Sequence, residues 1–155
     1  MNSETTWQVE QAAVLAVRRS LLLHTDFIDA TPSTDLGIDL IAFQPDPFVA
    51  IPIQVKGTQS GLKVYSKHSS PELLVAYVLD PLAEDSTVCL MQGSEAWNLP
   101  FEYIERGGRA SDHSEDNGNY RWSSITKLLR VMLLEKEASK ERWQHYVKVF
   151  TNKNE

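Results

Sequence analysis

The segments Gly37-Ile38-Asp39-Leu40-Ile41 and Ile53-Gln54-Val55-Lys56-Gly57 decide the fold of this chain. Both lie in apolar stretches, rich in isoleucine and valine, of the kind that form β-strands. Between them, Gln44-Pro45-Asp46-Pro47 is typical of a turn. The short separation predicts that the two strands pair as an antiparallel hairpin, with the second segment at the end of the second strand.

Three polar side chains on this hairpin form a candidate site. Strand alternation places Gln54 and Lys56 on one face, and Asp39 is expected to approach the Gln54 end across the turn. A carboxylate beside an amide oxygen and a backbone carbonyl is a hard oxygen site that suits Mg²⁺. An adjacent lysine could orient a metal-bound water or help to deprotonate it. A salt bridge between Asp39 and Lys56 is the structural alternative.

On both sides of the hairpin, hydrophobic periodicity and turn residues predict a mixed order of helices and strands, that is, an α/β fold. A helix over 5–24 precedes the hairpin, and a closing helical region over 123–150, capped by Ser123, follows it. The polar stretch 107–119 is predicted to be a mobile surface loop. The predicted strands are 26–30, 38–43, 48–56, 63–67, 73–79 and 87–91, followed by a short helix over 94–98 capped by Ser94.

Glu10 is a further acidic candidate, on the first predicted helix. Helical spacing places it on one stripe with Val14, Val17, Leu21 and His24. A carboxylate on an inward stripe is costly unless it is paired or bound to a metal. Its place near the helix N-terminus offers another explanation, because the helix dipole favours an acid there. The sequence leaves both explanations open.

The bulk properties limit the function. With 155 residues, 42% of them hydrophobic, the chain is predicted to form one domain over residues 1–155. Its single cysteine, Cys89, lies in an apolar run, which indicates a buried thiol and a reducing, cytoplasmic setting. No apolar run approaches the ~20 residues that cross a bilayer, so no membrane partner is expected. The net charge of −6 disfavours a long nucleic-acid-binding face, so any such contact must be local.

The combination of Glu10 with the two hairpin segments resembles the PD-(D/E)XK nuclease superfamily, over about residues 5–92. It is most similar to the branch, including type IV restriction-endonuclease-like domains, that carries Gln-x-Lys in place of Glu-x-Lys. Small members of unassigned function share the same cadence. The resemblance implies an α/β fold with a restriction-endonuclease-like αβββαβ core, a central mixed sheet flanked by helices. The stretch 57–72 departs from it, being short and polar for the helix of that core.

The resemblance also implies cleavage of phosphodiester bonds with Mg²⁺ or Mn²⁺, and DNA as a partner. By this resemblance Asp39, Gln54 and the carbonyl of Val55 would hold the metal, Glu10 would supply an acid from the first helix, and Lys56 would serve the attacking water. Neutral Gln54 should lower the metal affinity. Two functions stay open: a metal-dependent nuclease or nuclease-derived DNA-processing protein, and a catalytically silent module that binds protein or nucleic acid.

The remaining motifs predict no further catalytic site. The four histidines lack zinc-ligand spacing, and the acidic stretch that begins at Asp112 departs from a calcium loop, with Ser123 where a glutamate is required. Trp143, Tyr146 and Phe150 continue a helical spacing near the end of the sequence. We interpret them as a surface for homodimer formation, with packing on the chain's own sheet as the alternative.

Overall fold

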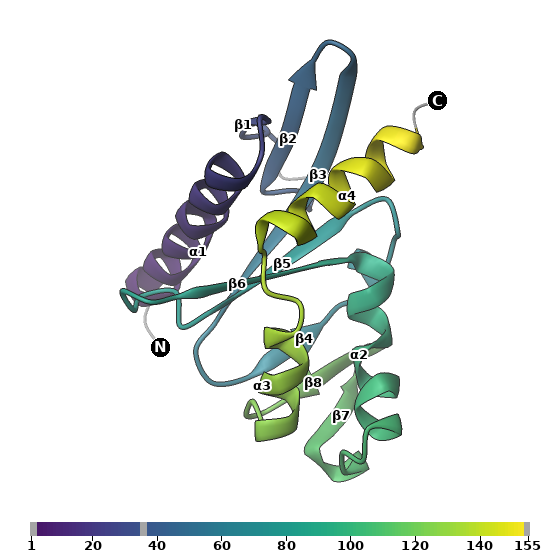
Figure 1. The fold of residues 1–155 in the computed structure, drawn as a ribbon. Coiled ribbons are helices and arrows are strands. Elements are labelled where there is room, and N and C mark those ends of the chain that lie inside the picture. The colour runs from purple at the N-terminus through teal and green to yellow at the C-terminus, as the bar shows by residue number, and fades with distance from the viewer. Residues whose placement is uncertain (1–2, 35–36, 154–155) are drawn as a thin grey trace.

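The computed structural model describes residues 3–34 and 37–153 (Figure 1). These residues form an α/β structure around a mixed, five-stranded central sheet. The helices are α1 (Ser3–His24), α2 (Gly93–Glu105), α3 (Lys127–Leu134) and α4 (Lys140–Asn152), with 3₁₀ turns η1 (Ser66–His68) and η2 (Ala110–Asp112). The strands are β1 (Ile28–Ala30), β2 (Leu40–Pro45), β3 (Phe48–Thr58), β4 (Leu62–Val64), β5 (Leu74–Leu79), β6 (Thr87–Gln92), β7 (His113–Asp116) and β8 (Asn119–Trp122).

The central sheet has the strand order β1-β2-β3-β5-β6. The first three strands form an antiparallel meander, and the β2–β3 hairpin rises above the rest of the sheet in Figure 1. Strand β5 is parallel to β3, and β6 is antiparallel to β5. The connection from β3 to β5 runs through β4 and η1, so no α-helix covers this crossover. The short, polar composition of this stretch explains the absence of a helix.

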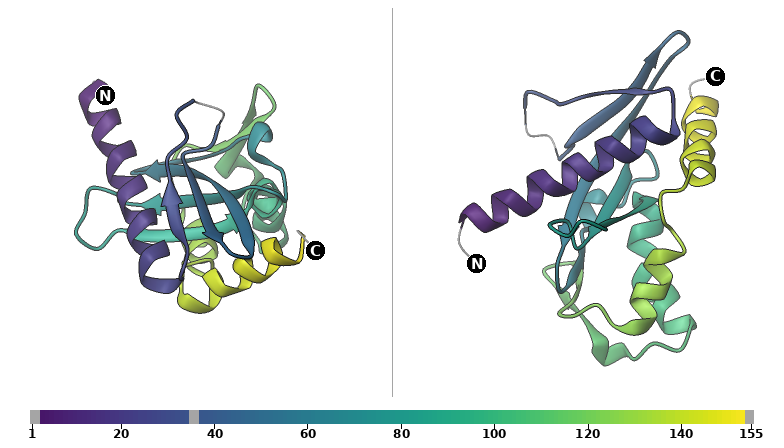
Figure 2. Two further views of the ribbon diagram at one scale, coloured as in Figure 1. Left: turned by 90° about the horizontal axis from the view of Figure 1, so that it is seen from above. Right: turned by 60° about the vertical axis from the view of Figure 1, so that its left-hand side comes forward.

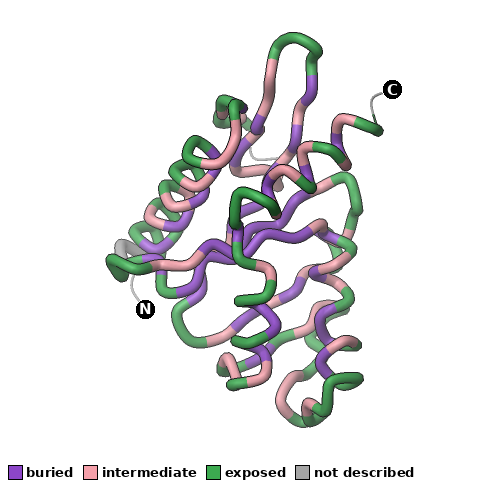
Figure 3. The backbone as a smooth tube through the Cα atoms, in the orientation of Figure 1, coloured by how far each residue is buried: buried purple, intermediate pink, exposed green. Residues whose placement is uncertain are grey.

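One face of the sheet is covered by α1 and α4, which Figure 2 shows packed along it from two directions. Helix α1 buries Val9, Ala13, Val17 and Leu21, each one turn after the last. These side chains pack against buried hydrophobic residues of the sheet and α4. Figure 3 shows the central strands mostly in the colour of buried residues. The sheet residues of this cluster include Ile51, Ile53, Val55, Leu74, Ala76 and Leu90.

Helix α4 is part of this core. Trp143, Tyr146 and Phe150 are 0%, 1% and 4% exposed, and Trp143 Nε1 also donates a hydrogen bond to Ser20 Oγ of α1 at 2.8 Å. The three aromatic side chains therefore pack on the chain's own sheet, which was the alternative to a self-association surface. Homodimer formation stays a prediction, but these residues no longer support it.

The opposite face of the sheet carries a second layer made of α2, α3 and a small sheet of order β4-β8-β7. Tyr77, Cys89 and Met91 of the central sheet are buried beneath it. Trp122 of β8, fully buried, packs against the ring of Tyr103 from α2 with centroids 5.5 Å apart. This layer covers only part of the face, and the polar side chains of β3 lie toward its margin.

The stretch 107–119 is not a loop, so this prediction was wrong. It contains η2, all of β7 and the turn into β8. The turn consists of Asn117 and Gly118, with φ angles of 53° and 81°. Two residues with positive φ form the turn that fits the twist of a two-residue hairpin, and Asn-Gly is its strongest sequence signal.

Helix boundaries also differ from the sequence predictions. Helix α2 runs to Glu105 rather than residue 98, and its cap is Gln92 instead of Ser94. Helix α3 is capped by Thr126, whose Oγ1 accepts a hydrogen bond from the Leu129 N–H at 3.2 Å, so Ser123 is not the cap. Among the described residues, no helix has both the length and the apolar character needed to cross a membrane.

Candidate functional site

Asp39 is tied to β3 by two hydrogen bonds. It lies directly before β2, and its backbone N–H donates to the Ile53 carbonyl at 2.9 Å. Its Oδ2 accepts a hydrogen bond from the Val55 N–H at 2.8 Å. The carboxylate therefore takes the place that a further carbonyl of β2 would occupy, and it is fixed beside β3 where the β2 ladder ends. Both Asp39 and Lys56 belong to the described residues, and no ion pair joins them, so the salt-bridge alternative is not what is found.

The carbonyl of Val55 lies on the same side of β3 as Asp39. In a strand, the N–H and C=O of one residue point toward the same neighbouring strand. Because the Val55 N–H meets the carboxylate of Asp39, the Val55 carbonyl also points toward the end of β2. An oxygen from a carboxylate and one from a backbone carbonyl thus share this edge.

Gln54 points to the other layer of the protein. It pairs with Val75 of β5, whose side chain belongs to the second core cluster, whereas its neighbours Ile53 and Val55 belong to the first. Gln54 is 6% exposed, and its Oε1 is buried with no hydrogen-bond partner in the described part of the chain. An unsatisfied buried carbonyl oxygen is costly, typically about 1–3 kcal/mol. A carbonyl oxygen of this kind is a ligand that a hard cation accepts.

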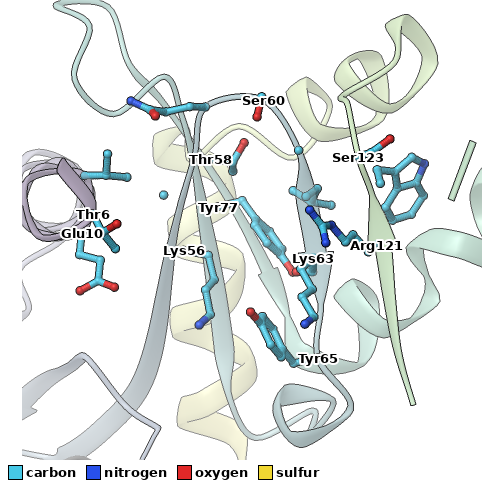
Figure 4. A pocket seen from close by; sticks show the side chains of 16 residues that line it. Thr6, Glu10, Lys56, Thr58, Ser60, Lys63, Tyr65, Tyr77, Arg121 and Ser123 are labelled. Atoms are coloured by element: carbon cyan, nitrogen blue, oxygen red, sulfur yellow. The ribbon is translucent and has the colours of Figure 1, made fainter. Parts of the chain in front are cut away.

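Lys56 shares the face of Gln54 and lines a cavity of about 400 Å³ at the end of β3. Its Nζ lies 4.6 Å from the centroid of the Tyr65 ring, a cation–π distance. Figure 4 shows Lys56 between Glu10 on α1 and the pair Lys63 and Tyr65 on the opposite wall. Asp39 and Gln54 do not line this cavity, so the predicted residues are distributed between the cavity and the edge of β2.

Glu10 is exposed and does not lie on the buried stripe of α1, which contradicts the expected inward position. The stripe begins one residue earlier, at Val9. This offset turns the carboxylate of Glu10 toward the rim of the cavity that Lys56 lines. Because Glu10 is exposed, its carboxylate needs no buried partner. It lies opposite Lys56, where it could face a ligand in the cavity.

His68 is a site residue that sequence reasoning missed. It is 7% exposed, its ring lies 5.5 Å from that of Tyr65, and a Cβ placed on Gly37 would lie 3.7 Å from its Nε2. Burial, together with the charges of Lys56 and Lys67, lowers the pKa of His68 to about 4. His68 is thus a neutral imidazole at pH 7. His68 belongs to no sequence motif and lies outside the hairpin in the sequence. The sequence therefore did not indicate that it lies near Gly37 and Lys56.

The donor set has the chemistry of a hard-cation site with a low charge. Among residues 3–34 and 37–153, no three His, Cys, Asp or Glu side chains form a group that could hold a metal ion. The candidate ligands are instead one carboxylate, one amide oxygen and one backbone carbonyl, from Asp39, Gln54 and Val55. All are oxygens of the kind that Mg²⁺ and Mn²⁺ accept. These residues fit such an ion, with weaker attraction than two carboxylates would give.

Cys89 has no place in this chemistry. It is fully buried in the second core cluster, and burial raises the pKa of its thiol to about 12. A thiol with so high a pKa is neither a nucleophile nor a metal ligand at neutral pH.

Comparison of the chain with protein-family models, curated proteins and solved structures found no match in any of the three. The assignment of a function therefore depends on the geometry and chemistry of the residues described above.

Proposed function

We propose that this protein is a metal-dependent nuclease, or a nuclease-derived DNA-processing protein, built on a restriction-endonuclease-like core. The order of elements supports the proposal: α1, the antiparallel meander β1-β2-β3, and then β5 parallel to β3. Under this proposal β4 and η1 stand in place of the middle helix of an αβββαβ core. The candidate residues lie on β3 and at the start of β2, as the resemblance implies.

The observation that carries the proposal is the unsatisfied Oε1 of Gln54. A folded chain with no ligand at this place would gain stability from an apolar residue there, because the buried amide oxygen has no partner. The carboxylate of Asp39 is fixed beside the same strand by the Val55 N–H. A bound cation would give the buried oxygen a partner and use the carboxylate that the Val55 N–H positions on the adjoining strand.

The chain's own residues supply the rest of the chemistry. Asp39, Gln54 and the Val55 carbonyl would hold the ion, with Glu10 as a further carboxylate at the cavity rim. A bound divalent ion stabilises negative charge on phosphate and lowers the pKa of coordinated water. Lys56 places a positive charge at the cavity floor, where it would bind a phosphate oxygen or orient the attacking water. The backbone hydrogen bond to Asp39 keeps that carboxylate in one orientation, so no reorganisation is needed when substrate binds.

A catalytically silent binding module is the second candidate. It is favoured by the neutral side chain of Gln54 and by the absence, within the described residues, of a group of three classical metal-ligating side chains. A module of this kind would keep the fold and bind protein or nucleic acid without cleavage.

Substitution of Lys56 tests the two candidates against each other. Wild type, Lys56→Ala and the control Lys148→Ala, an exposed lysine on α4, are assayed on single- and double-stranded DNA and RNA. Each assay is run with Mg²⁺, with Mn²⁺ and with a chelator, and thermal unfolding checks the fold of each variant. If the protein is a nuclease, cleavage should depend on the metal ion. Lys56→Ala should lower the cleavage rate by at least ~10³-fold, and Lys148→Ala should leave it unchanged. Cleavage that survives the chelator or Lys56→Ala refutes the mechanism, and no cleavage of any substrate favours the silent module.

A further inference from the structure

The cavity at the end of β3 has several cationic side chains in its wall, in a protein of net charge −6. Among the residues whose side chains are described, its charged lining consists of Lys56, Lys63, Arg121 and Glu10. Figure 4 shows Lys63 and Arg121 extending from one wall, with Glu10 and Thr6 of α1 on the other. Cations gathered at one hollow of an acidic protein concentrate the field there and attract an anion.

Lys63 and Arg121 are cross-strand neighbours. They are direct partners in the antiparallel register of β4 and β8, so their side chains leave the small sheet on the same face. Like charges placed directly opposite each other destabilise a sheet. Neither side chain forms an ion pair within residues 6–34 and 37–153, the part of the chain with described side chains. A structural role does not explain two cations at this pair of positions, whereas a bound anion would offset their repulsion.

Thr58 supplies a second, independent observation. It is the last residue of β3, 7% exposed, and lines the same cavity. Its Oγ1 is buried and has no hydrogen-bond partner within the described chain. Valine has the same shape and would remove this unsatisfied hydroxyl, so the presence of threonine is unexplained by packing. The Thr58 side chain lines the cavity, and a rotation about χ1 that brings its buried hydroxyl to the cavity surface would let it donate to an anion bound there.

Three lysine side chains lie around the ring of Tyr65, which lines the cavity. The Nζ atoms of Lys56, Lys63 and Lys67 lie 4.6, 5.1 and 5.4 Å from its ring centroid. Three ammonium groups around one ring repel each other, and the π-system offsets only part of this repulsion. The ring also offers an aromatic surface beside the cations, which is the combination that binds the base and phosphate of a nucleotide.

The cavity volume limits what can enter. A volume of about 400 Å³ accommodates a ligand of the size of one nucleotide. Helix α1 forms one wall and the β4–β8 sheet the other. Only a terminal or unpaired nucleotide of a strand, or a free nucleotide, fits these limits.

We propose that this cavity binds a single phosphorylated nucleotide, with Lys63 and Arg121 on the phosphate and the Thr58 hydroxyl donating to it. As a statement about substrate, the proposal rests on the proposed function and restricts it to nucleic-acid strands with a free or unpaired end. Binding itself needs no metal, because none of these three side chains belongs to the candidate metal group.

The test is a binding titration in the presence of a chelator, followed by the fluorescence of the cavity-lining Trp122 and by calorimetry. The probes are deoxynucleoside 5′-monophosphates, the matching nucleosides, inorganic phosphate, a single-stranded oligonucleotide with and without a 5′-phosphate, and a blunt duplex. We expect the monophosphates to bind at least 10-fold more tightly than the nucleosides. Tighter binding of the phosphorylated oligonucleotide than of the monophosphates identifies a strand end as the ligand, and the reverse identifies a free nucleotide.

Three variants separate binding from structure. Lys63→Met and Arg121→Met keep an apolar stem, and each should weaken monophosphate binding about 10-fold while raising the unfolding temperature of the free protein, since cation repulsion is relieved. Thr58→Val should weaken binding severalfold with an unchanged or raised unfolding temperature. Lys148→Met is the matched control and should leave affinity unchanged.

Equal affinity for nucleoside and monophosphate overturns the proposal, as does equal affinity of the duplex and the single strand. Unchanged affinity in Thr58→Val together with Lys63→Met also overturns it, and so does the absence of binding by every probe. Because the titration contains no divalent ion, its outcome is independent of whether the Asp39 group cleaves anything. A loss of cleavage in Lys56→Ala with intact nucleotide binding in the chelator would leave both proposals standing.

Discussion

The two faces of β3 differ in composition and in consequence. Toward α1 and α4, Ile51, Ile53 and Val55 are buried in a cluster of hydrophobic residues that includes side chains of both helices. On the opposite face, Gln54 and Thr58 are just as buried, but each has a polar atom without a partner. One strand thus carries a face that stabilises the fold and a face that keeps unsatisfied polar groups, which is the usual arrangement where a site is built on a rigid element.

The difference between the two faces of β3 indicates which buried positions are not optimised for stability. A strand selected only for stability would carry apolar side chains at both buried positions, because unsatisfied polar atoms lower the free energy of unfolding. The polar face is also the one that borders the cavity with Lys56, Lys63 and Arg121. The alternation of a single strand therefore separates the apolar face, which stabilises the fold, from the face that borders the cavity.

The largest expected effect comes from two adjacent residues, Ile53 and Gln54. Ile53→Ala should lower the free energy of unfolding by about 2–4 kcal/mol, because it leaves a hole in a fully buried apolar cluster. Gln54→Leu keeps the volume and removes the unsatisfied oxygen, so it should change that free energy by less than about 1 kcal/mol, or raise it. Urea unfolding measures both. If Gln54→Leu destabilised the protein as much as Ile53→Ala, the distinction between the two faces would be wrong.

A smaller effect is expected from Gln54→Glu. In a chelator this variant buries a second carboxylate next to Asp39, and it should lose about 2 kcal/mol of stability. Saturating Mn²⁺ should restore most of the loss, because the ion binds only the folded state and binds two carboxylates more tightly. The exposed neighbour Gln59→Glu is the matched control, for which neither change is expected. An unfolding midpoint of Gln54→Glu that does not respond to Mn²⁺ would argue against a metal at this place.

Much of this contrast can be predicted from the sequence. The alternation of apolar and polar residues along β3 determines which side chains share a face, and the Pro-Asp-Pro turn fixes its pairing with β2. The continuous apolar run of β5 predicts a strand covered on both faces, and all six of its residues are buried. These are local signals, and a local pattern needs no knowledge of the rest of the fold.

The remainder depends on contacts between segments far apart in the chain. Arg121 reaches the cavity only because β8 pairs with β4, and His68 reaches Lys56 only through the crossover from β3 to β5. No periodicity near either residue indicates these neighbours. Glu10 was misplaced by a single position on α1, and one residue corresponds to about 100° around a helix, which is enough to turn a side chain from the core to the rim.

The smallest expected effect concerns the acid response of His68. Its pKa of about 4 in the folded protein is below the value of 6.5 for a free histidine, so the unfolded chain takes up a proton before the folded protein does. Stability should therefore fall as the pH is lowered from about 6.5 to about 4, and this histidine should add nothing to the decrease below that range. Because other groups also titrate here, the measured quantity is the difference between wild type and the neutral variant His68→Gln.

We expect wild type to lose about 1 kcal/mol more than His68→Gln between pH 7 and pH 4, after allowance for solvent screening. Lys67→Gln is a further test, since removal of one of the two neighbouring positive charges should move the pKa of His68 back toward its ordinary value and reduce the difference. Urea unfolding at each pH provides the free energies. Parallel curves for wild type and His68→Gln would show that burial and the two neighbouring lysines do not lower the pKa of this imidazole in the folded protein.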